Sequence, residues 1–229
     1  IYIYHILKTF EELGVPAPIL KAIQEMVSES PMPVQEEVIP FLLGDDNDVI
    51  ALAQTGTGKT AAFGLPILQK IDVTTYHPQA LVLCPTRELC LQIADDLNDY
   101  SKYIDNLKVL PVYGGSSIES QIKTLKRGVH VVVATPGRLL DLMNRKTVDL
   151  SLVKNVIMDE ADEMLNMGFT DSINAILAEV PENRNMLLFS ATMPKEIANI
   201  TKKYMKNPKE IVIGNKNEGN KNIRDIYYM

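Results

Sequence analysis

Cysteine is scarce in this chain, and basic residues are outnumbered by acidic ones. Only Cys84 and Cys90 occur, with five residues between them. That spacing fits neither a zinc knuckle nor the disulfide framework of a small secreted domain, so reduced thiols are expected. With 29 acidic and 23 basic residues, the formal net charge of −6 excludes a protein whose whole surface grips nucleic acid. Any contact with nucleic acid must therefore be local.

Long apolar runs are also missing. No stretch approaches the roughly 20 apolar residues that span a bilayer. The N-terminus lacks the basic stretch, apolar stretch and cleavage site of a signal peptide. These absences predict no membrane partner and a cytoplasmic location. The rest is ordinary globular composition, with 46% hydrophobic and 23% charged residues in 229, enough for one substantial core.

Short apolar segments rich in β-branched residues alternate with longer segments of helical periodicity. Runs so short and so continuously apolar are typical of strands buried on both faces of a parallel sheet. The alternation therefore predicts an α/β fold, with a mostly parallel sheet and helices on both faces. The expected strands are 49–53, 80–84, 109–112, 131–134, 156–158, 186–189 and 211–213; the expected helices are 60–70, 87–100, 116–127, 169–180 and 194–204.

The two ends of the chain differ from this pattern. Residues 1–9 form an N-terminal extension without an assigned function, and residues 10–213 form the one predicted domain. Its first part, 10–43, is expected to be a helical extension, because apolar residues recur at helical spacing from Pro18 and again over 34–43. Residues 214–222 are polar and rich in turn formers, so 214–229 is expected to be a linker.

The sequence Ala53-Gln-Thr-Gly-Thr-Gly-Lys-Thr60 stands directly after a predicted strand and opens a predicted helix. This is the setting of a P-loop, whose glycines let backbone N–H groups surround phosphate oxygens. Lys59 is expected to reach the β and γ phosphates, and Thr60 to bind magnesium. The general pattern begins with glycine where Ala53 stands, and a glycine turn that caps a helix is the alternative.

Adjacent carboxylates end another predicted strand, in Val156-Ile-Met-Asp-Glu-Ala-Asp162. Ligands of parallel sheets bind outside the carboxyl ends of the strands, so Asp159 is expected beside the phosphates. It would hold Mg²⁺, partly through water, and Glu160 would act as general base. The alternative is a solvated acidic turn that leads into a helix.

Together these motifs resemble the DEAD-box RNA helicases. The sequence of the whole segment is similar to the bacterial cold-shock and ribosome-assembly branch of that family. The resemblance covers residues 10–229 and implies a RecA-like P-loop NTPase domain, ATP and Mg²⁺ as cofactors, and RNA-dependent ATPase and helicase activity. Lys59, Asp159 and Glu160 would be catalytic. The motifs, in the order of the family, are 53–60, Pro85-Thr-Arg-Glu-Leu89, Gly114-Gly115, Thr135-Pro-Gly-Arg138, Asp159-Glu-Ala-Asp162 and Ser190-Ala-Thr192.

The resemblance implies an RNA path that follows the backbone of single-stranded RNA with little sequence preference. Its segments offer glycines, hydroxyls, helix N-termini and arginines, and no array that reads base edges. Each segment alone is explained as well by a helix start or a turn. The implied RNA-binding residues are Pro85, Thr86, Arg87, Gly114, Gly115, Thr135, Pro136, Gly137 and Arg138.

The resemblance also implies a coupling set and an adenine-reading element. Ser190 and Thr192 would bond to Asp162 and couple hydrolysis to strand separation, with an N-cap before Pro194 as the simpler role. The ATP-binding residues would be Phe10, Pro33, Gln35, Gln54, Thr55, Gly56, Thr57, Gly58, Lys59 and Thr60. Two departures stand out. Val27-Ser28 replaces a glycine-aromatic pair that stacks on adenine, and Met32 replaces a threonine or serine.

The second RecA-like domain of the family has no counterpart in this sequence. Nothing here resembles its His-Arg-x-Gly-Arg-x-x-Arg motif, which supplies an arginine finger. The chain alone is therefore expected to bind nucleotide but to be nearly inactive, and to need that second domain as its partner. A nucleotide-gated RNA clamp or scaffold, and a DNA helicase on the same scaffold, are the two alternatives.

Overall fold

The computed structural model describes residues 8–26, 30–44 and 48–214. The Val27-Ser28 departure and residues 215–229 of the expected linker lie outside the described residues, as does most of the 1–9 extension. No helix in the described ranges is long and apolar enough to cross a bilayer.

A sheet of seven parallel strands forms the centre of the described structure, in the order β3-β4-β2-β5-β6-β1-β7. Most of its residues are buried, because helices cover both faces of the central strands, whereas the edge strand β7 is largely exposed. The strands are β1 (Val49–Leu52), β2 (Ala80–Leu83), β3 (Val109–Val112), β4 (Val131–Ala134), β5 (Asn155–Met158), β6 (Asn185–Ser190) and β7 (Lys209–Val212).

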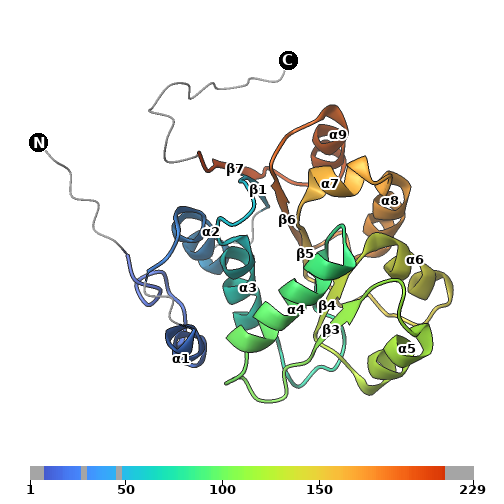
Figure 1. Ribbon diagram of the computed structural model, residues 1–229, viewed down its shortest axis with the longest axis horizontal. Helices are drawn as coiled ribbons and strands as arrows, with labels where there is room; N and C mark the ends of the chain where they lie inside the picture. The colour runs from blue at the N-terminus through green and yellow to red at the C-terminus, as the bar shows by residue number, and fades with distance from the viewer. Residues whose placement is uncertain (1–7, 27–29, 45–47, 215–229) are drawn as a thin grey trace, which may run out of the picture.

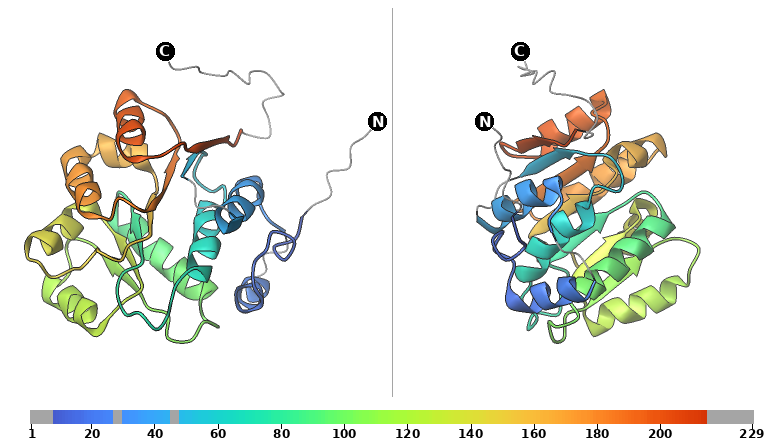
Figure 2. Two further views of the ribbon diagram at one scale, coloured as in Figure 1. Left: turned by 180° about the vertical axis from the view of Figure 1, so that it is seen from behind. Right: turned by 60° about the vertical axis from the view of Figure 1, so that its left-hand side comes forward.

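Two layers of helices sandwich the sheet, as Figure 1 and the turned views in Figure 2 show. One layer holds α1 (Ala17–Glu25), α2 (Pro33–Gly44), α3 (Lys59–Gln69) and α4 (Arg87–Tyr100). The other holds α5 (Ile118–Arg127), α6 (Pro136–Asn144), α7 (Ala161–Asn166), α8 (Thr170–Glu179) and α9 (Lys195–Tyr204). Each layer has its own apolar core, one on each face of the sheet.

The α/β fold with a parallel sheet is confirmed. Each of the seven expected strands forms within two residues of its predicted ends, and the five expected helices form with similar accuracy. Both apolar segments of the 10–43 extension are helical, as α1 and α2. Cys84 and Cys90 are free and fully buried.

Helix α6 was not expected, because Thr135-Pro136-Gly137 also has the composition of a turn. In the structure Thr135 precedes the helix, and Pro136 opens its first turn. Proline suits this position because its fixed φ is helical and its missing N–H would have no helical partner. The turn alternative for this segment is therefore wrong, whereas Gly114-Gly115 does lie in a turn after β3.

Candidate functional site

The loop between β1 and α3 has the backbone shape of a phosphate cradle. Gly56 and Gly58 have φ values of 77° and 81°, in the left-handed region that glycine adopts without strain. A Cβ added to Gly58 would lie 2.4 Å from Nε2 of Gln35, whereas nothing lies within 4 Å of one added to Gly56. The loop is thus packed tightly on the α2 side and open beside Gly56, at the start of helix α3.

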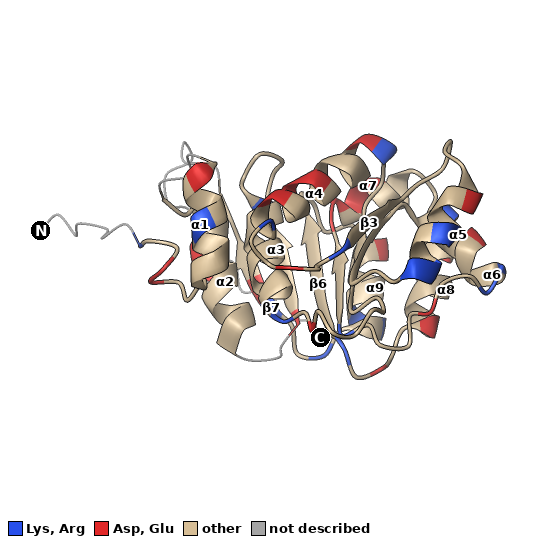
Figure 3. Cartoon of the chain, turned by 90° about the horizontal axis from the view of Figure 1, so that it is seen from below, with Lys and Arg blue, Asp and Glu red and all other residues tan. Residues whose placement is uncertain are grey.

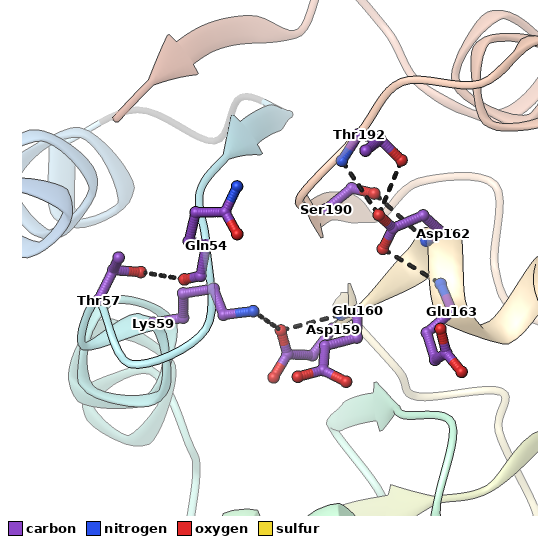
Figure 4. A network of polar contacts seen from close by, with 9 residues as sticks. All are labelled: Gln54, Thr57, Lys59, Asp159, Glu160, Asp162, Glu163, Ser190 and Thr192. Atoms are coloured by element: carbon purple, nitrogen blue, oxygen red, sulfur yellow. Dashed lines mark hydrogen bonds and ion pairs between the residues drawn. The ribbon is translucent and has the colours of Figure 1, made fainter. Parts of the chain in front are cut away.

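A buried ion pair joins this loop to the end of β5. Nζ of Lys59 lies 3.1 Å from Oδ1 of Asp159, and the two side chains are only 8% and 3% exposed. Figure 4 shows the lysine reaching across from the loop to the carboxylate. Burial raises the pKa of Asp159, and the facing ammonium of Lys59 opposes that rise. The two motifs that stand 100 residues apart in the sequence therefore meet as a charged pair shielded from water.

Glu160 is held in a strained backbone conformation next to this pair. Its φ of 50° is left-handed, which is unusual for a residue with a side chain. Its N–H donates to Oδ1 of Asp159 at 3.0 Å. Burial, followed by the neighbouring charge of Asp159, raises the pKa of the Glu160 carboxyl. Strain of this kind persists where the surrounding structure fixes it, and it gathers at functional sites.

Asp162, Ser190 and Thr192 are brought together between β5 and β6. The N–H of Asp162 donates to Oγ of Ser190 at 3.2 Å. Thr192 donates from its N–H, at 3.0 Å, and from its hydroxyl, at 2.8 Å, to Oδ2 of Asp162 (Figure 4). Partial burial pushes the pKa of Asp162 up, but these hydrogen bonds outweigh it and lower the pKa overall.

The simpler role proposed for Thr192, an N-cap before Pro194, is not what the structure has. Pro194 itself is the N-cap residue of α9, and the helix has no side-chain cap. The hydroxyl of Thr192 donates to the carboxylate of Asp162, a charged acceptor.

Gln35 on α2 is bonded to the phosphate cradle. Its Oε1 accepts from the N–H of Met32 at 2.9 Å, and its Nε2 donates to the carbonyl of Gly58 at 3.1 Å. Pro33 is exposed at the start of α2, and Phe10 is only 6% exposed, within the core beneath. Gln35 therefore lies beside the cradle but is only 5% exposed, and the Phe10 ring likewise offers little free surface.

The other residues predicted for ATP binding surround the cradle. Gln54 and Thr55 are exposed in the loop, and the hydroxyl of Thr57 donates to the carbonyl of Gln54 at 2.7 Å. Thr60 is the second residue of α3 and partly exposed, one position after Lys59. All of them thus lie in one loop and the first turn of the helix that follows it.

The segments predicted to contact RNA follow β2, β3 and β4, on the other half of the same sheet edge. Thr86 caps α4 by accepting from the N–H of Leu89 at 3.2 Å. Arg87 is exposed, and its guanidinium lies 5.0 Å from the ring centre of Tyr113. Tyr113 directly precedes the Gly114-Gly115 turn. In that turn Gly114 and Gly115 are exposed, and Gly115 has a φ of 79°.

The first turn of α6 completes this group. Nη1 of Arg138 donates to the carbonyl of Ser116 and to Oε1 of Gln121, both at 3.0 Å. Gly137 is exposed, but Thr135 and Pro136 are buried, and so is Pro85 after β2. The two prolines thus set the direction of the chain and offer almost no surface to a ligand.

Two residues that the sequence analysis passed over hold this group together, Tyr113 and Gln121. Gln121 is 5% exposed and donates from Nε2 to the carbonyl of Tyr113 at 3.2 Å. A signal for it was present in the sequence. Gln121 stands on the same helical face as Ile118, Ile122 and Leu125, a stripe where a polar residue needs a buried partner.

The comparisons with known proteins agree with this arrangement. The family model described as DEAD/DEAH box helicase matches residues 32–200. The chain belongs to the DEAD/DEAH box helicase family. The match spans the Gln35 element, the phosphate cradle, the acidic motif and Ser190-Ala-Thr192, so the family assignment rests on the whole described site.

Relatives of this DEAD/DEAH box domain are similar over nearly all of the chain. The chain is 49% identical to the ATP-dependent RNA helicase DeaD of Haemophilus influenzae, in an alignment that covers 92% of this chain. It is also 49% identical to the ATP-dependent RNA helicase DeaD of Escherichia coli K12, in an alignment that covers 90% of this chain. It covers only 34% and 32% of those two proteins. The crystal structure of a DEAD box protein from Methanococcus jannaschii matches 89% of the chain and 55% of that protein, with 45% identity and a TM-score of 0.85.

Proposed function

We propose that this chain is the ATP-binding half of an ATP-dependent RNA helicase. It spans about a third of the curated relatives it matches, so the activity belongs to a longer protein. The observation that carries the proposal is the buried pair of Lys59 and Asp159, which joins the phosphate cradle to the acidic motif. A buried cation beside an open cradle at a helix N-terminus suits the phosphates of a nucleotide.

ATP and Mg²⁺ fit the residues at this site. The space beside Gly56 leaves room for phosphate oxygens, and Lys59 stands at its edge as a donor. Thr60 and Asp159 would hold magnesium, partly through water, since oxygen ligands suit this ion. When bound, magnesium neutralises charge on the phosphates. Gln35 would read the adenine edge from its place beside Gly58.

Glu160 is the proposed general base for the attacking water. A base works best when its pKa lies near the working pH, and burial beside Asp159 moves the pKa of Glu160 in that direction. Asp162, Ser190 and Thr192 would carry the state of the nucleotide site to the RNA, because their hydrogen bonds link the loop after β5 with the loop after β6.

The RNA backbone is the proposed ligand of the loops after β2, β3 and β4. These offer an exposed helix N-terminus at Arg87, an open glycine turn and the guanidinium of Arg138, which suit phosphate and 2′-hydroxyl oxygens. A second RecA-like domain would supply the arginine finger, worth roughly 10³ to 10⁵ in turnover in related nucleotidases. Alone, this chain is expected to bind nucleotide without unwinding RNA. We place the longer protein in the cytoplasm.

Calorimetry with ATP, ADP and GTP in the presence of magnesium tests the nucleotide site. Adenine-selective binding is expected, with loss of all binding in Lys59→Ala and loss of selectivity in Gln35→Ala. Lys202→Ala, an exposed lysine on α9, is the matched control and should bind as the unchanged chain does. No nucleotide binding by the unchanged chain would overturn the proposal in favour of a scaffold.

A further inference from the structure

Gln121 is the only buried residue of α5, and it is polar. It lies among apolar neighbours of the same helical face, Ile118, Ile122 and Leu125, which pack on the core of that layer. Burying an amide there is unfavourable unless both of its ends are hydrogen-bonded, and a buried leucine would stabilise the core more. The hydrogen bonds that Gln121 makes must therefore account for the presence of an amide at this position.

Those bonds join the loop after β3 to helix α6. Nε2 of Gln121 donates to the carbonyl of Tyr113 at 3.2 Å, and Oε1 accepts from Nη1 of Arg138 at 3.0 Å. The orientation of the amide is fixed by its partners, because a guanidinium only donates and a carbonyl only accepts. The same Nη1 also donates to the carbonyl of Ser116 at 3.0 Å. Gly114 and Gly115 are thus tied down on both sides of their turn.

Helix α4 joins the same cluster through Tyr113. The guanidinium of Arg87 lies 5.0 Å from the centre of the Tyr113 ring, within the range of a cation–π contact. A Cβ added to Gly115 would stand 3.8 Å from Nη1 of Arg87. The ends of β2, β3 and β4 are therefore linked through Arg87, Tyr113, Gln121 and Arg138.

The bonds to Arg138 also decide which edge of its guanidinium is presented. Nη1 is engaged by Gln121 and Ser116, while no hydrogen bond or ion pair among the described residues involves Nε or Nη2. Nε and Nη2 form the edge that matches two oxygens of one phosphate. We propose that Gln121 is a positioning residue, which fixes Arg138 with this edge toward the backbone of RNA and holds the glycine turn beside it.

This proposal rests on the proposed RNA path, so its test has one arm that needs no RNA. In the first arm, the NMR order parameter of the Arg138 Nε–H bond is measured in the RNA-free chain. Gln121→Leu, which removes both bonds, should make that group markedly more mobile. Gln121→Glu keeps an acceptor for Arg138 and should leave it ordered, while the lost bond to Tyr113 loosens the turn. Equal order in all three proteins would overturn the proposal.

In the second arm, binding of a fluorescein-labelled oligouridylate is measured by anisotropy at low salt. Gln121→Leu should weaken binding roughly tenfold, the range of one charge-assisted contact. In an Arg138→Ala background the same change should add little, because its effect passes through the arginine. ADP affinity should be the same throughout, which shows that the variants fold. A full additional loss in the Arg138→Ala background would contradict positioning.

The two arms separate the possible failures. If the unchanged chain does not bind the oligouridylate, the proposed RNA path fails, whatever the order of Arg138. If it binds and Gln121→Leu binds equally well, the RNA path stands and the positioning role is overturned.

Discussion

Two halves of one sheet edge, the proposed nucleotide site and the proposed RNA site, are built differently in this molecule. The nucleotide half, the loops after β1, β5 and β6, contains buried charges, a left-handed glutamate and a tightly packed glycine. The RNA half, the loops after β2, β3 and β4, contains exposed glycines, a side-chain cap and one arginine held by a neutral amide. Figure 3 shows charged residues on helices of both layers, and among the described residues the ion pair shielded from water lies in the nucleotide half.

The difference follows from what each proposed ligand requires. Chemistry at a phosphate needs charges fixed in advance, since preorganised groups do not have to reorient during the reaction. Following an RNA backbone needs donors that water can reach, because the ligand is itself highly solvated. We therefore expect substitutions in the nucleotide half to affect both folding and binding, and those in the RNA half to affect mainly binding.

The largest expected effect is on stability when one buried charge is removed. Lys59→Ala should lower the free energy of unfolding by about 3 kcal/mol or more, because Asp159 would be left buried without its partner. Arg87→Ala, the same loss of positive charge in the RNA half, should cost about 1 kcal/mol at most, because the residue is exposed. Urea denaturation measures both, and equal losses would contradict the comparison.

A glycine pair gives the next contrast. Gly58→Ala places a Cβ 2.4 Å from Nε2 of Gln35 at a φ of 81°, so it should destabilise the chain by roughly 1–3 kcal/mol. Gly114→Ala meets no atom within 4 Å and should stay within about 0.5 kcal/mol of the unchanged chain. Thermal unfolding of both variants decides the point. A stable Gly58→Ala variant would mean that the cradle is looser than described.

Asp162→Asn should produce a smaller and pH-dependent change. The loss of a charged acceptor for Thr192 should lower stability by about 1–2 kcal/mol at neutral pH. Since the folded pKa of Asp162 is lowered, its contribution is present above its ordinary value of 3.8 and is lost as the pH falls through the folded pKa. The gap between the two proteins should close in acid, whereas a constant gap would exclude this origin. Glu163→Gln, an exposed neighbour, is the control.

The sequence was enough for the sheet and for most of the nucleotide half. Buried parallel strands show as continuous apolar runs, and Lys59 and Asp159 each follow such a run, so their approach could be expected. The cap at Thr86 could also be predicted, because its hydrogen bond is made within four residues of chain.

One feature that the sequence did not reveal was a local ambiguity, and the others depend on tertiary packing and on contacts between distant residues. Helix α6 was missed because proline and glycine open helices and turns alike. Gln121 was missed because its partners, Tyr113 and Arg138, lie 8 and 17 residues away on other elements. The left-handed φ of Glu160 has no local signature, since glutamate does not favour it, and it lies between two buried residues, Asp159 and Ala161.

The smallest expected signal comes from the thiols beneath the RNA half. The neighbouring Cys90 thiol, together with burial, raises the pKa of Cys84, and both side chains are 0% exposed. Neither should react with a disulfide reagent on the time scale of minutes until the chain is unfolded by guanidinium. Reaction in the native state would show that the RNA half opens locally, and that its core is less firmly packed than the burial of these two thiols indicates.

The division of the sheet edge is tested most directly by NMR titration of the ¹⁵N-labelled chain with ADP and magnesium, and separately with a short oligouridylate. ADP should shift the amides of 54–60 and 159–162, whereas the RNA should shift those of 86–87, 114–116, 135 and 137–138. Shifts by both ligands in the same loops, or RNA shifts confined to another face, would contradict the account.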